Sequence, residues 1–293
     1  MSFGPHLLLA LLEGSVSAFV LALTALGLAL VFGVMRIVNV AHGEFFMLGA
    51  VLAAALAGLF DLPPAIGFAL ALLLSPILVG AIALVADRLI LRRLAYEPEA
   101  TIVATIGLLF ILQQSVLSLY GPDARSVAAP IDFRIQFPWF GYSGYKLIVA
   151  ALAGVLLMAV WYGLKKTKLG LVMRATQLDS EMAQAFGIPV QRVYALVFAL
   201  GAMLAGVAGV LIVPIRQAHY LMGLDPLLLS FAVVIIGGLG SLRGALMAAF
   251  IIGLSDGVIS VFFSPTLAKI LATLAVALVL VFKPAGLFGG RAQ

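Results

Sequence analysis

Long apolar stretches, separated by short polar connections, follow one another along nearly the whole chain. A helix must carry roughly 20 apolar residues to cross the ~30 Å hydrocarbon core of a bilayer. The pattern therefore predicts transmembrane helices over 15–34, 44–60, 66–86, 100–119, 145–164, 194–215 and 266–282, and a broken apolar segment over 227–263. We expect an all-α polytopic transmembrane helical bundle that forms a single domain over residues 1–293.

The broken segment decides the number of crossings. About 14 residues over 227–239 would span only ~21 Å as a helix, which is less than the ~30 Å core. We therefore predict a short, tilted or partly buried helix there, and eight or nine crossings in all. If this helix counts as a crossing of its own, nine crossings bring the tail with Lys283 and Arg291 to the cytoplasmic side.

Basic residues gather in two connections, at 87–99 and 165–193. They are Arg88, Arg92 and Arg93 in the first connection, and Lys165, Lys166, Lys168, Arg174 and Arg192 in the second. Because Lys and Arg collect in cytoplasmic loops, both connections should face the cytoplasm. Counting back three crossings from residue 87 places the N-terminus outside.

Composition agrees with a membrane protein and removes several function classes. The chain is 64% hydrophobic and only 10% charged, with a mean hydropathy of +1.24, whereas soluble domains are about one quarter charged. The net charge of +5 follows from the cytoplasmic loops, so we expect contact with membrane lipid and no nucleic-acid partner. The absence of cysteine excludes disulfides and thiolate metal sites.

No enzyme signature is found. The sequence has no GxxxxGK[ST] phosphate loop, no HExxH pair and no GxSxG elbow, so we expect no catalytic residue, no bound metal and no cofactor. GGLGSLRG is spaced GxGxxxG and has no βαβ pattern around it, so a dinucleotide site is not expected either.

Two polar interruptions carry the candidate chemistry, RIVNVAHGEFFMLGA at 36–50 and IIGGLGSLRGALMAAF at 235–250. Irregular backbone at membrane depth is tolerated only where it is buried in protein or lines a wet cavity, and interrupted helices in two halves point to a transporter's substrate path. The helix N-termini in such breaks suit a carboxylate. The candidate pathway residues are Asn39, His42, Gly43, Glu44, Gly237, Gly238 and Gly240. Cytoplasmic turns with capping residues fit the pattern equally well, and the weak internal repeat is compatible with parallel or inverted halves.

The connection at 165–193 contains a predicted amphipathic helix at 174–188. Leu178, Met182 and Phe186 share one face, and Gly187 with Pro189 marks the end. A partner protein could grip such a helix and move the attached spans; an interfacial helix resting on lipid is the alternative. Only Glu44 and Asp256 are acidic residues expected at depth, which is little for ion coupling. Energy should therefore come from a partner, with a self-sufficient secondary carrier or channel as the alternative.

Three blocks together carry a family resemblance. RIVNVAHGEFFMLGA, RATQLDSEMAQAFGIPVQRVYALVFALGAMLAGVAGVL and DPLLLSFAVVIIGGLGSLRGALMAAFIIGL resemble the permease subunits of high-affinity branched-chain amino acid ABC importers, specifically the shorter of the two paired permeases. Relatives in this class carry urea, short amides, other amino acids and aromatic acids. The resemblance implies a multi-pass protein of the bacterial inner membrane that transports its solute by alternating access and is not itself an enzyme.

The resemblance also implies partners and a coupling site. The partners are a second, similar permease, two cytoplasmic ATPases and a periplasmic binding protein. The implied residues of a coupling helix, which docks on an ATPase, are Arg174, Ala175, Asp179, Ala183, Gly187 and Ile188. The spacing of alanine before glycine and isoleucine matches the importer loop pattern, whereas the Glu-Ala-Ala triplet of that pattern is missing.

Overall fold

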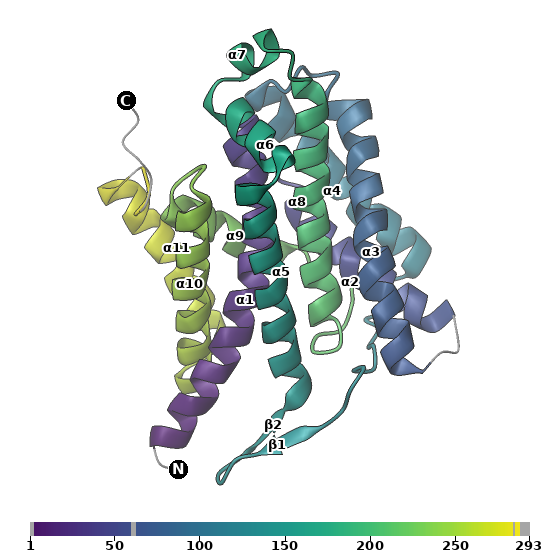
Figure 1. The fold of residues 1–293 in the computed structure, drawn as a ribbon. Helices are drawn as coiled ribbons and strands as arrows, with labels where there is room; N and C mark the ends of the chain where they lie inside the picture. Colours follow the sequence, from purple (N-terminus) through teal and green to yellow (C-terminus); the bar gives the residue numbers. More distant parts are fainter. Residues whose placement is uncertain (1–2, 60–62, 284, 288–293) are drawn as a thin grey trace.

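The computed structural model describes residues 3–59, 63–283 and 285–287, and helices dominate it (Figure 1). In chain order the elements are α1 (Phe3–Met35), α2 (His42–Leu59), α3 (Pro64–Ala86), the π-helix η1 (Asp87–Leu91), α4 (Pro98–Tyr120), β1 (Arg134–Gln136), β2 (Gly141–Ser143), α5 (Gly144–Lys166), α6 (Lys168–Leu178), α7 (Ser180–Ala185), α8 (Val190–Ile212), α9 (Leu224–Gly237), α10 (Leu242–Phe262) and α11 (Pro265–Phe282). The strands described form one short antiparallel ribbon, in which Ile135 pairs with Tyr142. The predicted all-α bundle is confirmed.

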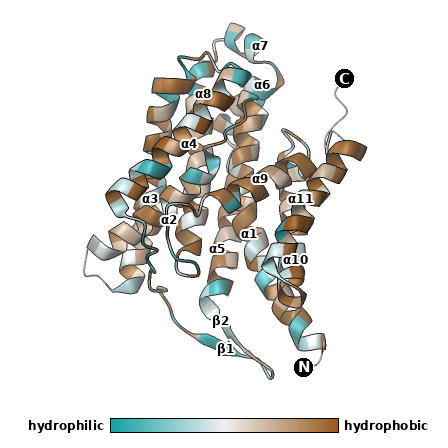
Figure 2. Ribbon diagram, turned by 180° about the vertical axis from the view of Figure 1, so that it is seen from behind, coloured by the Kyte–Doolittle hydropathy of each residue, from teal (hydrophilic) through white to brown (hydrophobic). Residues whose placement is uncertain are grey.

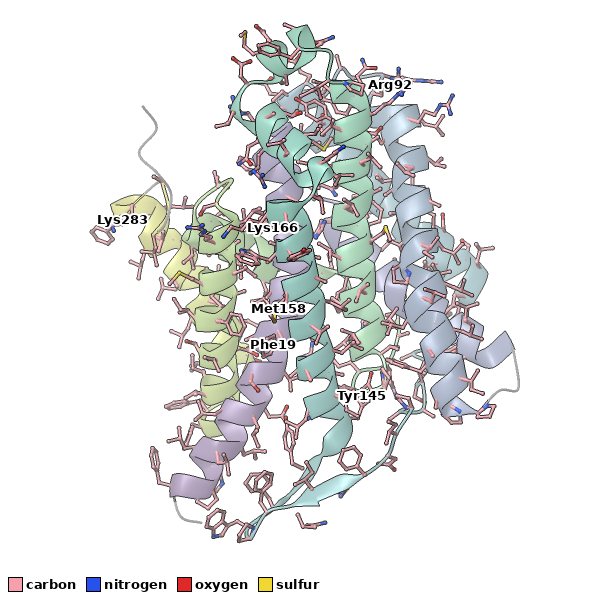
Figure 3. All side chains as sticks on the ribbon, viewed as in Figure 1. Phe19, Arg92, Tyr145, Met158, Lys166 and Lys283 are labelled. Carbon is pink, nitrogen blue, oxygen red and sulfur yellow. The ribbon has the colours of Figure 1, made fainter. Side chains whose placement is uncertain are left out.

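Among the described residues, seven helices are long and apolar enough to cross a bilayer: α1, α3 with η1, α4, α5, α8, α10 and α11. The protein is therefore a multi-pass membrane protein, and hydrophobic residues predominate along its helices (Figure 2). Arg92, Lys166 and Lys283 come from three separate connections and lie toward the same end of the molecule, opposite Tyr145 (Figure 3). The positive-inside rule predicts that this end faces the cytoplasm, and we call it the cytoplasmic end.

The first interruption lies deep in the bundle. After α1 ends at Met35, the segment 36–41 has no helical structure and returns toward the middle of α1. Nε2 of His42 lies 2.9 Å from the Thr24 carbonyl oxygen, and Thr24 precedes the end of α1 by eleven residues, or about 16 Å of helix. α2 therefore begins about halfway through the bundle, where a turn at the membrane surface would not be found.

A second return has the same form in the other half. α8 descends from the cytoplasmic end, antiparallel to α1 (Figure 1), and residues 213–223 then lead back to the start of α9. α2 and α9 begin in backbone contact, because a Cβ atom on Gly43 would lie only 2.2 Å from the Gly223 carbonyl oxygen. From there α2 leads toward α3, and α9 leads toward α10.

The internal repeat is inverted. α2 and α3 pack against α8, just as α9 and α10 pack against α1, and α1 itself contacts α8. The group α1, α2 and α3 thus corresponds to the group α8, α9 and α10, with the same packing partners. Because α8 runs antiparallel to α1, the second group has the opposite orientation across the membrane. Each of α2 and α9 completes one passage together with the non-helical segment before it, 36–41 for α2 and 213–223 for α9. Added to the seven long helices, they bring the number of passages to nine.

Glycines allow the two central helices to touch. A Cβ atom on Gly27 of α1 would lie 2.5 Å from the Gly201 carbonyl oxygen of α8. A Cβ atom on Gly49 of the broken helix α2 would lie 2.1 Å from the Gly206 carbonyl oxygen, also of α8. Without a hydrophobic force between helices in lipid, such close approach stabilises the bundle through dispersion contacts. The broken helices are thereby held against α1 and α8 at the centre of the protein.

Candidate substrate pathway and coupling surface

The first interruption is shaped by its own backbone and by α4. Arg36 follows α1 with a φ of 56°, a left-handed conformation that ends the helix. Oδ1 of Asn39 accepts a hydrogen bond from the Ala41 amide at 3.1 Å, which is the local contact by which Asn turns the chain. The Val40 amide donates to Oγ1 of Thr105 on α4 at 3.2 Å. The segment 36–41 is therefore held by a hydrogen bond within itself, at Asn39, and by one to Thr105 of α4.

Two ionisable residues begin α2, and both are fully buried. The His42 ring donates from Nε2 to the Thr24 carbonyl, which can only accept, at 2.9 Å. Nε2 of Gln113, on α4, donates to Oε1 of Glu44 at 3.2 Å. These contacts join the start of α2 to α1 and α4 at mid-depth.

Each of these polar residues also keeps an unused polar atom. Nδ2 of Asn39, Nδ1 of His42 and Oε2 of Glu44 have no hydrogen-bond partner among the described residues. A buried polar atom left unpaired costs about 1–3 kcal/mol, and polar groups retained within a membrane mark functional paths. The junction can therefore offer hydrogen-bond donors and acceptors to a small polar solute.

The contribution of α4 was missed by the sequence reasoning. Thr101, Thr105 and Gln113 are all buried, and their spacing places them within about one third of the helix circumference. The shared face of these three polar side chains was the available signal, although Gln114, Ser115 and Ser118 on the exposed side of α4 obscure it.

A small cavity of about 80 Å³ lies beside the junction, between α1, α9 and α10. Its polar lining is Ser17, Thr24, Arg216, Asp225 and Asp256. Thr24 also accepts the hydrogen bond from His42, so the cavity reaches the same level as the start of α2. Asp256, expected at depth from the sequence, lies here and not beside Glu44.

The glycines of the second interruption lie away from the junction of α2 and α9. Gly237, Gly238 and Gly240 are at the far end of α9, which is 14 residues long, or ~21 Å from its start. The Gly240 carbonyl accepts a hydrogen bond from Nε2 of Gln177 on α6 at 3.2 Å, and a Cβ atom on Gly237 would lie 2.5 Å from the Gly244 carbonyl oxygen. The structure thus brings Asn39, His42, Gly43 and Glu44 together and leaves these three glycines near the cytoplasmic connection.

The cytoplasmic connection holds two helices, so the prediction of one continuous helix over 174–188 is wrong. Asp179 separates α6 from α7 with an extended backbone, at φ −153° and ψ 107°. Its Oδ1 accepts hydrogen bonds from the amides of Glu181 at 3.0 Å and Met182 at 2.9 Å. Asp favours this capping role over a helix interior, because its side chain binds the free amides of the following turn. Gly187 ends the segment with a φ of 82°, as predicted.

The predicted coupling residues have different positions. The guanidinium of Arg174 donates to the Leu164 carbonyl and ties α6 to α5. Ala183 is buried, and its carbonyl accepts from the Ile188 amide at 3.0 Å. Ala175 is half-buried, and Gly187 has no neighbouring atom within 4 Å of where a Cβ atom would lie. Arg174, Asp179 and Gly187 are therefore at the surface of the connection, whereas Ala183 is inside it.

Apolar side chains project from this end of the molecule. Leu178 is 82% exposed, Met182 53% and Phe186 80%, and α7 lies beyond the ends of the long helices (Figure 1). We call these three residues the apolar ridge. Exposed apolar patches of this kind mark surfaces that contact a protein partner or a membrane.

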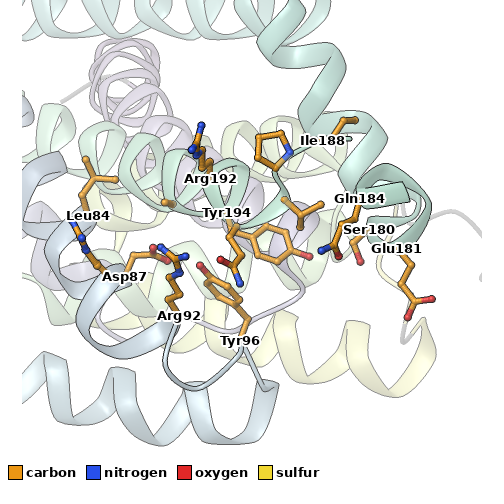
Figure 4. Close-up of a pocket in the computed structure, with 15 residues that line it drawn as sticks. Leu84, Asp87, Arg92, Tyr96, Ser180, Glu181, Gln184, Ile188, Arg192 and Tyr194 are labelled. Atoms are coloured by element: carbon orange, nitrogen blue, oxygen red, sulfur yellow. The ribbon is translucent and has the colours of Figure 1, made fainter. Parts of the chain in front are cut away.

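A cavity of about 890 Å³ lies beside the ridge, between η1, the 92–96 loop, α7 and the start of α8 (Figure 4). Its charged lining residues are Asp87, Arg88, Arg92, Glu181 and Arg192. Burial, followed by the nearby Asp87 carboxylate, raises the pKa of the Tyr96 phenol above its usual value. This polar cavity was not foreseen from the sequence.

Comparison with known proteins is consistent with this architecture. A family model described as "Branched-chain amino acid transport system / permease component" matches residues 10–282. The chain is 28% identical over 284 residues to the high-affinity branched-chain amino acid transport system permease protein LivH of Escherichia coli K12, covering 92% of this chain and 91% of the relative. It is 31% identical over 265 residues to the probable branched-chain amino acid transport permease protein LivH of Methanocaldococcus jannaschii, covering 87% and 82%. It is 28% identical over 309 residues to the permease protein BraD of Pseudomonas aeruginosa, covering 97% and 96%.

Proposed function

The chain belongs to the branched-chain amino acid transport permease family, and from this premise we propose that it is the membrane permease subunit of an ABC importer. It moves branched-chain amino acids, or a related small carboxylate or amide, inward across the bacterial inner membrane by alternating access. ATP is hydrolysed on partner subunits, and this chain performs no covalent chemistry.

One observation carries the proposal: two half-length helices, α2 and α9, begin in contact at mid-depth. Helix starts at this depth expose amide groups and a partial positive charge toward a solute carboxylate. Asn39, His42 and Glu44 line the junction and keep unused polar atoms. Rocking of the inverted halves about this junction would expose it first to the outside and then to the cytoplasm.

The cavity of 80 Å³ supports an amino acid as the solute. Arg216, Asp225 and Asp256 line it, so it holds charges of both signs. The Asp225 carboxylate is already paired with Nζ of Lys269 at 2.5 Å. The Arg216 guanidinium therefore suits an α-carboxylate, and the Asp256 carboxylate suits an α-ammonium group. A neutral solute such as urea has no need of this arrangement.

The apolar ridge receives the force. An ATPase groove would hold Leu178, Met182 and Phe186, and α6 and α8 would carry its movement into the bundle. The polar cavity beside the ridge gives the same partner a set of charged groups to bind. Gly240 contacts Gln177 of α6. In this proposal Gly237, Gly238 and Gly240 therefore pass the movement to α9 and line the cytoplasmic part of the path.

We propose four partners: a second, similar permease, two cytoplasmic ATPases and a periplasmic binding protein. In proteoliposomes that contain the permeases and ATPases, uptake of leucine delivered by the binding protein should require ATP inside the lumen. The matched control contains the chain without ATPases and should show no uptake. Rapid uptake in that control would contradict the proposal and favour a secondary carrier or channel.

A further inference from the structure

A second cavity of about 500 Å³ lies between α1, α5, α6 and α10, in the cytoplasmic half of the bundle. In Figure 1, α1 is visible between α5 and α10, below α6. The groove is separate from the junction of α2 and α9 and from the apolar ridge, so neither of the sites described above accounts for it.

The rim of the groove is basic. Lys165 at the end of α5, Arg174 on α6 and Arg243 at the start of α10 line it, and none of the described lining residues is acidic. All three side chains are exposed. The Arg174 guanidinium is oriented by its hydrogen bond to the Leu164 carbonyl, and Nζ of Lys165 lies 4.7 Å from the centre of the Trp161 ring. Three cations from three helices thus surround one opening.

The wall of the groove is apolar. Leu26, Leu30 and Val34 of α1 follow one helix face at spacings of four residues and form the buried floor of the groove, at 3%, 3% and 5% exposed. Trp161 and Leu246 line the groove from α5 and α10, and Trp161 is 47% exposed. A free anion would need the basic rim but would gain nothing from this wall.

We propose that the groove binds an anionic phospholipid of the cytoplasmic leaflet, with its phosphate at Lys165, Arg174 and Arg243 and one acyl chain against Trp161 and Leu246. Basic pockets between helices on the cytoplasmic side attract anionic headgroups. The side chains at the rim act as donors for the phosphate oxygens. A zwitterionic lipid brings an ammonium group that the cations would repel, so the groove selects by headgroup charge.

The two tryptophans of the chain provide a direct test. Trp139→Phe leaves Trp161 in the groove as the only indole. This variant is placed in nanodiscs of phosphatidylglycerol and phosphatidylcholine at equal mole fractions, with bromine on the acyl chains of one lipid or of the other. We expect brominated phosphatidylglycerol to quench Trp161 about two-fold more strongly than brominated phosphatidylcholine.

The ratio of quenching by the two lipids is taken within each variant. A change in the intrinsic fluorescence of Trp161 between variants therefore does not affect it. Combined Lys165→Gln, Arg174→Gln and Arg243→Gln should bring the quenching ratio to one, and Arg243→Gln alone should lower it. Lys166→Gln combined with Lys168→Gln and Arg192→Gln removes the same number of charges outside the groove and should preserve the ratio. Circular dichroism checks that each variant is folded.

Three outcomes would overturn the proposal. Equal quenching by the two lipids in the Trp139→Phe protein would show no selection by charge. Protection of Trp161 from both brominated lipids would show that protein, such as a second copy of the chain, covers the groove. Loss of the preference on adding millimolar glycerol phosphate would show a site for small anions only.

Discussion

Gly43 and Gly223 lie in backbone contact where α2 and α9 begin. A Cβ atom on Gly43 would lie 2.2 Å from the Gly223 carbonyl oxygen, and one on Gly223 would lie 2.5 Å from that of Gly43. Both neighbours are backbone atoms, which cannot move aside as a flexible side chain can. The two half-length helices can meet at mid-depth only because neither residue has a side chain.

Gly43→Ala should therefore destabilise the protein. The added methyl group must push α2 and α9 apart, and overpacking of this kind costs about 1–3 kcal/mol. Thermal unfolding of the purified protein in detergent measures the effect. Gly107→Ala is the matched control, because no atom lies within 4 Å of its Cβ position on α4. An equal melting temperature for Gly43→Ala and wild type would contradict the close contact.

The hydrogen bond between Gln113 and Glu44 should stabilise the fold, and the effect of replacing one of the two residues should depend on the presence of the other. Gln113→Leu leaves Oε1 of Glu44 buried without its donor, and a buried group left unpaired costs about 1–3 kcal/mol. Once Glu44→Leu has removed the acceptor, the same change at Gln113 should cost much less. A double-mutant cycle in chemical unfolding gives the coupling energy, and additive effects would show that the two side chains act independently.

The charges in the 80 Å³ cavity should be needed for uptake of a zwitterionic solute. Arg216→Gln and Asp256→Asn each remove a charge that the proposal assigns to one end of an amino acid. We expect a loss of leucine uptake of about ten-fold for either change, corresponding to ~1.4 kcal/mol of lost binding, while uncoupled ATP hydrolysis persists. Arg134→Gln in the external ribbon removes a charge away from the cavity and should leave uptake intact. Normal leucine uptake by both cavity variants would remove the cavity from the substrate path.

Much of the architecture could be predicted because span length and loop charge are local properties of a sequence. Runs of 20 apolar residues near Phe68, Val149 and Phe198 give long helices regardless of what surrounds them. The start of α2 could not be placed in the same way, because His42, Gly43 and Glu44 would also suit an ordinary helix start at the membrane surface. Their depth depends on Gly223, which is 180 positions further along the chain.

The candidate site shows the same limit. Asn39, His42 and Glu44 were recognisable as polar residues in an apolar region, but Thr24 and Gln113, the partners of His42 and Glu44, come from other helices. The break at Asp179 was readable in principle, since Asp followed by two free amides is a local cap. The helical spacing of Leu178, Met182 and Phe186 instead favoured one continuous helix. Such a pattern of apolar side chains carries no information on the backbone conformation of Asp179.

The cap at Asp179 makes a prediction about α7. Asp179→Ala removes the acceptor for the amides of Glu181 and Met182 and should cost about 1 kcal/mol of local helix stability. Asp179→Asn keeps a capping oxygen and serves as the conservative control. Hydrogen exchange over residues 180–186 should become several-fold faster in the alanine variant only. Equal exchange in all three proteins would show that tertiary contacts, and not the cap, hold α7.

The apolar ridge should matter for coupling and hardly at all for folding. Leu178 and Phe186 are 82% and 80% exposed, so replacing both with serine removes little buried area, and the melting temperature of the isolated permease should change by no more than a surface substitution does. Transport driven by the ATPases should fall at least ten-fold, because the groove that holds these side chains loses its main apolar contact. Ile131→Ser with Trp139→Ser, at residues that are 51% and 63% exposed outside the cytoplasmic connection, removes comparable apolar surface without this effect. Pull-down of the ATPases by the detergent-solubilised permease then separates lost docking from lost force transmission. Undiminished transport with serine at both ridge positions would place the docking surface elsewhere, with the polar cavity around Arg92 and Arg192 as the next surface to test.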